Sequence, residues 1–373
     1  MVGEGDPLSK WGPLYLFSWF LGILAMLTKE NTITLPLMII LCELCFFKTG
    51  RRIKWRYVLP FLVILPIIPI LLFSTKSIIS GDMGRLAASN AYLDPHYFLT
   101  QFRVMITYIR LLFIPVNQNL DYDYPLAKAF FDPPSLASLI ALIFIVIAAF
   151  KLFKRYRLIS FSIFWFLITI LPESSLIHLK EDFIYEHWLY LPLFGYGLFL
   201  VSALYYLFGK NFLKTMVSVL LVIAACYSIL AYNRNLVWKD ELTLWNDTVL
   251  KSPQKARPYD SRGIAYAEKG NLDQAISDFT RAINIDPRGA DAYNNRGGAY
   301  VRKGNLDQAI SDCNKAIEIN PKYADAYSNR GIVYFIKKEY DKSWKDVHKA
   351  EELGYKVNPQ FLAELKKVSG REK

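Results

Sequence analysis

The sequence predicts an all-α protein, in which a polytopic transmembrane helix bundle is followed by an α-solenoid of helical repeats. Hydrophobic residues make up 53% of the 373 residues. Between Trp11 and Tyr232 they gather in runs of about 15–20 residues, near the length that crosses a bilayer. Further along, the triplets Ser261–Gly263, Asn295–Gly297 and Asn329–Gly331 recur every 34 residues, a period typical of stacked helix-turn-helix units.

The apolar runs predict seven membrane spans, in a transmembrane domain that covers residues 1–232. The predicted spans are residues 11–28, 33–47, 57–73, 134–153, 158–177, 189–208 and 213–231. The apolar stretch at 102–116 is short and carries Arg103 and Arg110, and a charge is costly at the bilayer centre. We therefore expect a re-entrant or interfacial helix at 102–116 rather than a span.

Three clusters of basic residues predict the orientation of the bundle. They surround Arg51, Lys154 and Lys210, and positively charged loops tend to stay in the cytoplasm. Seven crossings then put the repeats outside: in the periplasm if the chain belongs to a bacterial cytoplasmic membrane, or in the endoplasmic-reticulum lumen of a eukaryote. The net charge of +11 lies mostly in the membrane part, which favours membrane lipid as a partner and not nucleic acid.

The repeats carry small residues and tyrosines at fixed positions of the 34-residue period, which is the signature of tetratricopeptide repeats. We place three repeats in residues 256–357, with a linker at 233–255 before them and a capping helix and tail at 358–373 after them. The same phase extends backward from the first repeat. It predicts that Val237–Leu250 forms the second helix of an incomplete repeat, so that the linker contains part of a repeat helix.

The solenoid also predicts a groove for an extended protein or peptide ligand. Ser261, Asn295 and Asn329 hold the same position in the first helix of successive repeats. A column of hydroxyl and amide groups can hydrogen-bond a peptide backbone without reading its sequence. In the competing interpretation these residues face only solvent or neighbouring loops.

A polar turn separates the first two predicted spans on the outer side. Lys29 and Glu30 lie in this turn, between apolar segments. An ammonium group can bind phosphate oxygens there, and a neighbouring carboxylate can orient it. In the competing interpretation the pair only anchors the helix ends at the lipid headgroups.

The outer region after the third span collects arginines and carboxylates. Arg103 and Arg110 precede Asp121 and Asp123, in a segment rich in tyrosine and amides that suits a polar head group such as a sugar phosphate. The two aspartates are either a carboxylate pair for acid/base chemistry or turn-forming residues that pair with the arginines.

A third polar cluster contains Glu173, Glu186 and His187, beside aromatic residues typical of a membrane interface. The histidines and carboxylates show no spacing of a common zinc or iron site, so we expect no metal. The four cysteines are too few for a disulfide framework.

The order of these motifs resembles a known family. Thr28–Glu30, Gln101–Val104, Pro115–Asp121, Leu171–Ser175 and Glu186–Pro192, closed by the repeats, are similar to segments of bacterial relatives of the transmembrane-and-tetratricopeptide-repeat protein O-mannosyltransferases. These are polytopic glycosyltransferases of the type C fold. The resemblance implies a polyprenyl-phosphate-linked sugar as donor substrate and protein Ser or Thr as acceptor, with no resident cofactor established.

The resemblance also implies roles for individual residues. Lys29 and Glu30 would line the active-site cavity near the donor phosphate, with Arg103, Arg110 and Glu186 as further candidates. In that family the catalytic acidic pair lies in the first outer loop, upstream of the Lys-Glu turn, and the residues ahead of the first predicted span do not match that loop. We therefore expect a truncated or degenerate relative that lacks its general base, and its catalytic residues are unknown.

Two functions remain open from the sequence. The first is an inverting glycosyltransferase, which needs a carboxylate to accept the proton of the acceptor hydroxyl and cations for the leaving phosphate. The second is a non-enzymatic membrane scaffold that recruits partners through its repeats. A transporter is disfavoured because the spans show no inverted repeat. An upstream in-frame extension with an acidic pair would favour the enzyme, whereas a stop codon just before Met1 would favour the scaffold.

Overall fold

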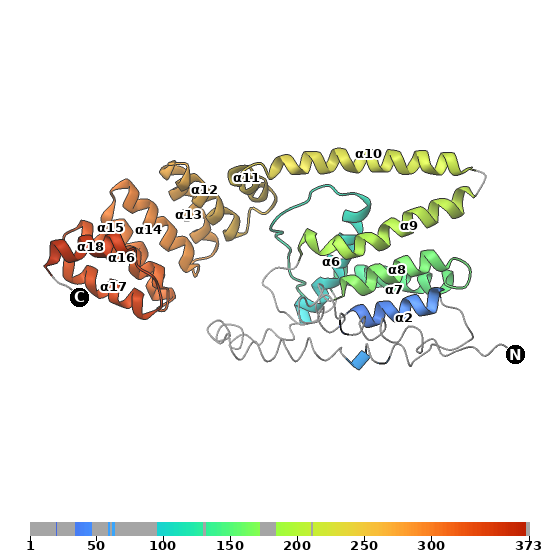
Figure 1. The fold of residues 1–373 in the computed structure, drawn as a ribbon, viewed down its shortest axis with the longest axis horizontal. Helices are drawn as coiled ribbons and strands as arrows, with labels where there is room; N and C mark the ends of the chain where they lie inside the picture. The colour runs from blue at the N-terminus through green and yellow to red at the C-terminus, as the bar shows by residue number, and fades with distance from the viewer. Residues whose placement is uncertain are drawn as a thin grey trace. The chain divides into compact units, whose positions relative to one another are not determined.

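The computed structural model is all-helical over the residues that it describes, which confirms the predicted fold class (Figure 1). The described residues are 20, 34–46, 59, 62–63, 95–129, 132–171, 184–209 and 212–370. The chain divides into two compact units. Unit 1 consists of Met1–Gln118 and Tyr124–Leu230, and unit 2 consists of Asn119–Asp123 and Ala231–Lys373.

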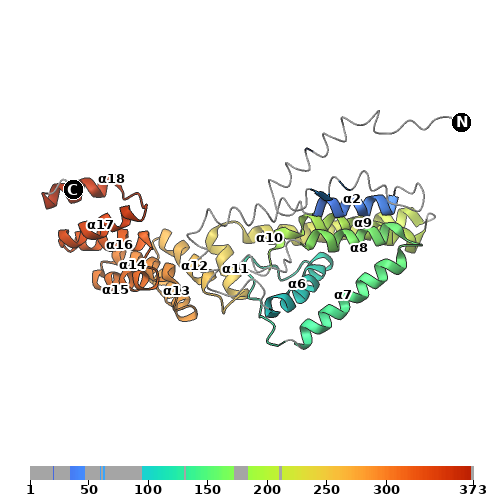
Figure 2. The ribbon, with the colours of Figure 1, turned by 90° about the horizontal axis from the view of Figure 1, so that it is seen from below.

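Unit 1 is built from helices, most of them apolar (Figures 1 and 2). Its described elements are α2 (Leu35–Phe46), α6 (Pro95–Phe113), α7 (Pro133–Leu152), α8 (Arg157–Ile170), the short 3-10 helix η3 (Glu186–Leu189), α9 (Tyr190–Phe208) and most of α10 (Leu213–Val237). Helix α8 packs against α2, α7 and α9, and α6 packs against α7. Helix α8 therefore takes part in most of the helix-helix contacts given for this unit.

Three of the described helices, α7, α9 and α10, are long and apolar enough to cross a membrane. Helices α2 and α8 are apolar but shorter; α2 lies inside the predicted span at 33–47, and α8 overlaps the predicted span at 158–177 and begins one residue before it. The predicted spans at 11–28 and 57–73 lie outside the described residues, apart from isolated positions. The number of seven spans therefore stays a prediction.

Helix α6 differs from the segment that the sequence predicts at 102–116. It begins at Pro95 and ends at Phe113, and it is not among the three helices apolar enough to span. Its buried side chains include Gln101 and Tyr108, so polar groups take part in its packing. Its re-entrant or interfacial placement stays a prediction.

Aspartate side chains fix the first turns of two helices. Asp132 accepts hydrogen bonds from the N–H and hydroxyl of Ser135 at 3.1 and 2.7 Å at the start of α7. Asp240 accepts from the N–H of Thr243 at 3.0 Å at the start of α11 (Glu241–Lys251). Such caps satisfy backbone N–H groups that have no partner inside the helix.

Helices α8 and α9 approach closely because α9 carries Gly195 at their interface. A Cβ atom at this position would lie 2.8 Å from Trp165 Cδ1 and 2.9 Å from the carbonyl oxygen of Ser162. The indole N–H of Trp165 also donates to the carbonyl oxygen of Leu191 at 2.9 Å. The glycine therefore sets the distance between these two helices.

Unit 2 is a solenoid of paired helices (Figure 1). Its repeats are formed by the pairs α12 (Ala256–Glu268) with α13 (Leu272–Ile285), α14 (Ala290–Lys303) with α15 (Leu306–Ile319), and α16 (Ala324–Ile336) with α17 (Tyr340–Glu352), and α18 (Pro359–Ser369) follows. The first helix of each pair carries a glycine at the same position, which allows the second helix of that pair to approach closely. A Cβ on Gly263 would lie 2.6 Å from the ring of Phe279.

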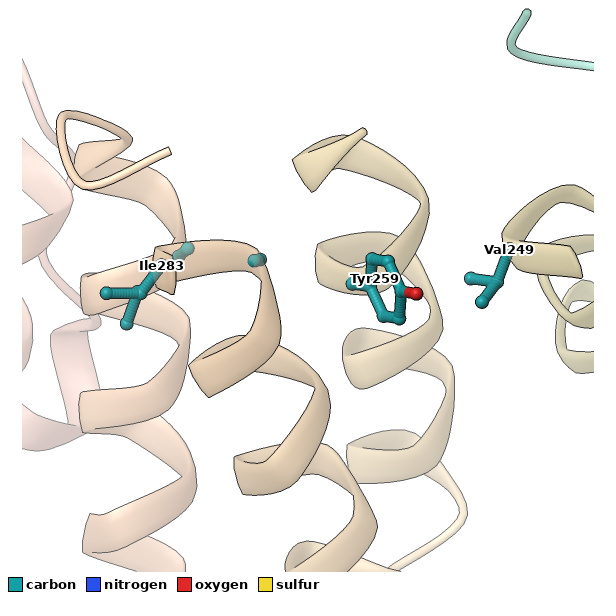
Figure 3. Packing of buried hydrophobic residues seen from close by; sticks show 5 residues of the cluster. Val249, Tyr259 and Ile283 are labelled. Carbon is teal, nitrogen blue, oxygen red and sulfur yellow. The ribbon is translucent and has the colours of Figure 1, made fainter. Parts of the chain in front are cut away.

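Helix α11 packs against α12, as the second helix of a preceding repeat would. Val249 of α11 joins a buried cluster with Tyr259 of α12 and Ile283 of α13 (Figure 3). The helix begins at Glu241 rather than at the predicted Val237, because α10 continues to Val237 and the Asp240 cap starts a new helix.

Helix α18 covers the other end of the solenoid. Its Leu365 is fully buried in a cluster with Trp344 and Val347 of α17. Phe361 meets Phe335 edge to face, with ring centroids 5.4 Å apart. An apolar solenoid end needs such a cover to stay out of water.

Candidate functional site

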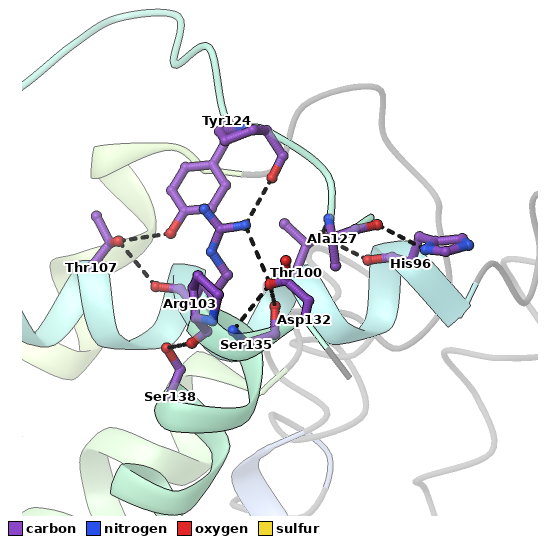
Figure 4. A network of polar contacts seen from close by, with 11 residues as sticks. His96, Thr100, Arg103, Thr107, Tyr124, Ala127, Asp132, Ser135 and Ser138 are labelled. Atoms are coloured by element: carbon purple, nitrogen blue, oxygen red, sulfur yellow. Dashed lines mark hydrogen bonds and ion pairs between the residues drawn. The ribbon is translucent and has the colours of Figure 1, made fainter. Parts of the chain in front are cut away.

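One face of α6 carries a polar cluster that includes two of the predicted site residues. Arg103, Thr107 and Arg110 are spaced by four and three residues, so they share one side of the helix. Tyr124, from the segment after this helix, lies over Arg103 and Thr107 (Figure 4). Its ring centroid is 5.3 Å from the Arg103 guanidinium carbon, and its hydroxyl is 3.0 Å from Thr107 Oγ1. We call these four residues the α6 polar cluster.

The charges of both arginines affect the pKa of the Tyr124 phenol. Burial raises its pKa, while the hydrogen bond with Thr107 and the charges of Arg103 and Arg110 act in the opposite direction. The net pKa shift is upward, so the phenol is neutral at physiological pH. The cluster therefore combines two permanent cations with one neutral hydroxyl.

Arg103 is fixed by partners on its own unit. Its Nη1 donates to the carbonyl oxygen of Pro125 at 3.2 Å and lies 3.9 Å from Asp132 Oδ2. The hydrogen bond from the Ser135 hydroxyl is the main cause that lowers the pKa of Asp132, and Arg103 adds to it. Among the described residues Arg103 uses only Nη1 in these contacts, whereas a guanidinium offers five N–H donors.

The segment that carries Tyr124 is fastened to the first turns of α6. Nδ1 of His96 lies 2.7 Å from the carbonyl oxygen of Ala127. The N–H of Ala127 donates to Oγ1 of Thr100 at 2.9 Å (Figure 4). Arg110, at the other end of the helix, is exposed and donates to the carbonyl oxygen of Val116 at 3.2 Å.

The remaining membrane-domain candidates are placed only in part. Lys29, Glu30 and Glu173 lie outside the described residues. Glu186 and His187 open η3. The turn before them is tied to α6, because the backbone N–H of Tyr185 donates to the hydroxyl of Tyr108 at 3.0 Å.

The structure assigns Asp121 and Asp123 to unit 2, whereas Arg103 and Arg110 belong to unit 1. Asp121 is 2% exposed, and its carboxylate pairs with Lys255 and with Arg257, whose Nε is 2.7 Å away. Of the two interpretations of these aspartates, pairing with Arg103 or Arg110 is therefore wrong for Asp121. The reason is that the chain carries residues 119–123 into the solenoid before it returns to unit 1.

Ser252 holds the backbone around Asp121. Its hydroxyl donates to the carbonyl oxygen of Asp121 at 2.6 Å. The same hydroxyl oxygen lies 2.7 Å from the amide nitrogen of Asn119 and 2.9 Å from the backbone nitrogen of Asp123. Asp123 therefore contributes its backbone N–H, and its side chain is exposed at the surface.

The predicted peptide-groove asparagines make contacts between the first helices of neighbouring repeats. Nδ2 of Asn295 donates to the carboxylate of Asp260 at 3.1 and 3.2 Å. Nδ2 of Asn329 donates to Oδ1 of Asn294 at 2.9 Å. Both side chains are half-buried, as is Ser261. The amide N–H groups therefore serve the solenoid itself, and the groove stays a prediction.

Sequence reasoning missed Asp260. Burial raises its pKa to about 6, with a smaller contribution from the charge of Asp291 and an opposing one from the hydrogen bond with Asn295. A signal was present, because Asp260, Asn294 and Ser328 are polar residues at one position of the 34-residue period.

The arginines that recur every 34 residues are half-buried and connect neighbouring helices, and we call them arginine clamps. In each repeat the guanidinium binds both carboxylate oxygens of an aspartate 16 residues later, at 2.7–2.8 Å, and Nη1 reaches a side chain 16 residues earlier. The pairs are Arg262 with Asp278, Arg296 with Asp312, and Arg330 with Asp346. These arginines join three helices and are structural residues rather than ligand sites.

The comparisons with protein families identify the solenoid. Models described as tetratricopeptide repeat match residues 290–323 and 313–345, and a model described as TPR repeat matches residues 263–304. The repeats of unit 2 are therefore tetratricopeptide repeats, as the sequence period predicts.

Two curated relatives are distant homologues of the chain. Protein O-mannosyl-transferase F38B6.6 of Caenorhabditis elegans is 25% identical over 270 residues, which cover 71% of this chain and 38% of the relative. Protein O-mannosyl-transferase Tmtc3 of Drosophila melanogaster is 24% identical over 169 residues, which cover 43% of this chain and 18% of the relative. The chain thus spans well under half the length of each relative.

Solved structures of two other proteins are similar to about a third of the chain. The first TPR of Spaghetti (RPAP3), bound to an HSP90 peptide, is 34% identical, with a TM-score of 0.30, and covers 31% of this chain and 92% of that chain. The crystal structure of MamA is 30% identical, with a TM-score of 0.29, and covers 30% of this chain and 66% of that chain.

Proposed function

We propose that this chain is part of a glycosyltransferase-like membrane protein that transfers a sugar from a polyprenyl-phosphate donor to Ser or Thr residues of a protein. The names of the distant homologues and the tetratricopeptide repeats support the proposal. The single observation that carries it is the α6 polar cluster, which presents Arg103 and Arg110 on one helix face beside the neutral phenol of Tyr124.

The proposed transfer breaks the bond between the anomeric carbon of the sugar and a phosphate oxygen, and forms a bond from that carbon to the acceptor oxygen. The negative charge left on the phosphate needs cations nearby. A guanidinium meets phosphate oxygens with paired N–H donors. Arg103 and Arg110 are about 10 Å apart along the helix axis, so both can contact one lipid-linked phosphate and its sugar.

Other candidates complete the proposed site. Lys29 and Glu30 are proposed to bind the donor phosphate, and Glu173, Glu186 and His187 to line the same cavity. The acceptor hydroxyl must give its proton to a carboxylate. Asp121 is a poor candidate for this role, because Lys255 and Arg257 already hold its carboxylate inside unit 2.

Binding of polyprenyl phosphate to the full chain in detergent tests the donor site. We expect Arg103→Gln to weaken binding strongly. Arg103→Lys should weaken it less, because lysine keeps the positive charge but lacks the planar set of N–H donors of a guanidinium. Arg155→Gln, on the loop after α7, is the matched control. Equal affinity of the Arg103→Gln and Arg155→Gln variants would reject a phosphate role for Arg103. Sugar transfer from polyprenyl-phosphate mannose is then compared in the same variants.

The solenoid is proposed to bind the acceptor and to lie outside the cytoplasm. The first-helix residues Ser261, Asn295 and Asn329 are proposed to face an extended peptide with the hydrogen-bonding capacity that their neighbours leave unused. For the orientation, Asp291→Cys adds a thiol at an exposed site. Labelling of this variant above the unmodified chain by a membrane-impermeant maleimide, in intact cells, supports the outer location, and labelling only after lysis contradicts it.

A non-enzymatic scaffold is the second candidate function. The observation that favours it is the solenoid, whose three repeats are clamped by arginines and covered by α18. A scaffold predicts that partners co-purify equally with the unmodified chain and the Arg103→Gln variant, and that neither binds polyprenyl phosphate. Phosphate binding that depends on Arg103 favours the transferase.

A further inference from the structure

Unit 1 contains an apolar pocket of about 210 Å³ between four helices. Its wall includes Ile109 and Leu112 of α6, Ile145 of α7, Ile163 of α8 and Phe199 of α9. The α6 residues that line it do not belong to the α6 polar cluster. The pocket is therefore a separate feature of the same helix.

Among the described residues that line the pocket, no hydroxyl group is free to donate a hydrogen bond to water. Its two hydroxyl groups are engaged elsewhere: Ser162 donates to the carbonyl oxygen of Leu158 at 2.7 Å, and Tyr196 shares a hydrogen bond of 2.7 Å with Tyr227. A buried water needs two to four polar partners, and apolar cavities of about 150 Å³ stay dry and take up hydrocarbon. Hydrocarbon is therefore the chemistry that fits this space.

The walls of the pocket are fixed before anything binds. Phe113 meets Tyr196 and Phe199 edge to face, with ring centroids 4.9 and 6.3 Å apart. Tyr227 donates to the carbonyl oxygen of Leu112 at 2.7 Å and so holds the end of α6. A preformed pocket costs little ordering of side chains when a ligand enters.

We propose that this pocket holds the end of an acyl chain of a bilayer phospholipid. Helices α7 and α9 contribute to its wall and are long and apolar enough to span a membrane, and both also expose large aromatic side chains such as Phe144 and Phe194. Acyl chains are the hydrocarbon at highest concentration around such helices, and mass action favours the most abundant ligand of suitable chemistry. Lipid tails are as apolar as the leucine and isoleucine side chains of the wall.

The test uses the full chain in nanodiscs made with a phospholipid that carries a diazirine at the end of one acyl chain. After photolysis, mass spectrometry locates the adducts. We expect adducts on the peptide that contains Leu112 and Phe113. The double variant Ile145→Phe, Ile163→Phe fills the pocket and should lower these adducts several-fold, while adducts on exposed Phe144 stay unchanged.

The matched control is Ile140→Phe, Ile143→Phe, which adds the same two rings on the exposed side of α7. It should leave the Leu112 adducts unchanged. If the pocket-filling variant does not fold, Phe199→Trp replaces it as a smaller filling change. Leu112 adducts that are missing, or that persist in the filled variants, overturn the proposal. Their removal by a modest excess of polyprenyl phosphate, but not of phospholipid, would assign the pocket to an isoprenoid chain and also overturn it.

Discussion

Arg257 donates its Nε–H to Oδ2 of Asp121 across 2.7 Å, although 136 residues separate the two in the sequence. Lys255 binds the other oxygen of the same carboxylate, which is almost fully buried. These ion pairs connect the segment Asn119–Asp123 to the solenoid, and the segment belongs to unit 2. A neighbouring aspartate, Asp123, uses only its backbone at this site.

Asp121→Asn should therefore destabilise unit 2. Removing one partner of a buried ion pair leaves uncompensated charge and typically costs 3–5 kcal/mol, and the partial exposure of Lys255 and Arg257 lowers our expectation to about 2 kcal/mol. Limited proteolysis of the full chain, followed at the repeats, measures the change. Asp123→Asn is the control and should behave like the unmodified chain. Equal proteolysis of both variants would mean that the ion pairs contribute nothing.

Asp260 predicts a pH dependence of stability. Its pKa in the folded chain is raised to about 6, above the ordinary value of about 3.9 in an unfolded chain. The folded state therefore binds more protons between these values. The contribution of Asp260 is most favourable below pH 4 and is lost as the pH rises through 6, by at most about 3 kcal/mol.

Asp260→Asn should remove this loss and make the chain more stable than the unmodified one at pH 7, since Asn295 can still donate to the new amide oxygen. The measurement is urea unfolding of both chains, followed by a probe in the repeats, at several pH values from 4 to 7. The difference between the two curves isolates Asp260 from the other carboxylates. A difference that does not change with pH would refute the raised pKa.

The arginine clamps predict that lysine is not an adequate substitute. Arg296 binds both oxygens of Asp312 and also reaches Thr280. Lysine keeps the charge but cannot make three directed contacts, so Arg296→Lys should lower the unfolding free energy by about 1–3 kcal/mol. Arg288→Lys, at an exposed site, is the control. The measurement is thermal unfolding of the repeats. An equal melting temperature for the Arg296→Lys variant and the unmodified chain would contradict a stabilising role of the Arg296 contacts.

Two glycines of α9 predict opposite results for the same substitution. In Gly195→Ala the new methyl group would lie within 3 Å of Trp165 and of the Ser162 backbone, so α8 and α9 must separate, at a cost of about 1–3 kcal/mol. In Gly197→Ala the methyl group meets nothing within 4 Å, and the better helix propensity of alanine should preserve or raise stability. Thermal unfolding in detergent compares them. Similar melting temperatures would show that the helices are not in close contact at Gly195.

The fold class and the phase of the repeats could be predicted from the sequence alone. Apolar runs and a 34-residue period are local patterns, and each reflects the rise and face of a helix regardless of what the rest of the chain does. Because the helical pattern is local, the sequence predicted a helix within residues 237–250, and α11 covers most of them. Its predicted start at Val237 was wrong, because α11 begins at Glu241. Boundaries depend on caps such as Asp240, which compete with continuation of the preceding helix.

The contacts between polar side chains, in contrast, depend on how the chain folds in three dimensions. One of the two interpretations of the sequence paired Asp121 with Arg103 or Arg110, yet in the structure its carboxylate binds Lys255 and Arg257. The packing of repeats likewise turned Asn295 toward Asp260, 35 residues earlier. The position of Tyr124 over Arg103 also depends on the segment after α6, which His96 and Thr100 hold at Ala127. Hydrogen bonds and ion pairs act over a few ångströms in space, so sequence distance does not predict them.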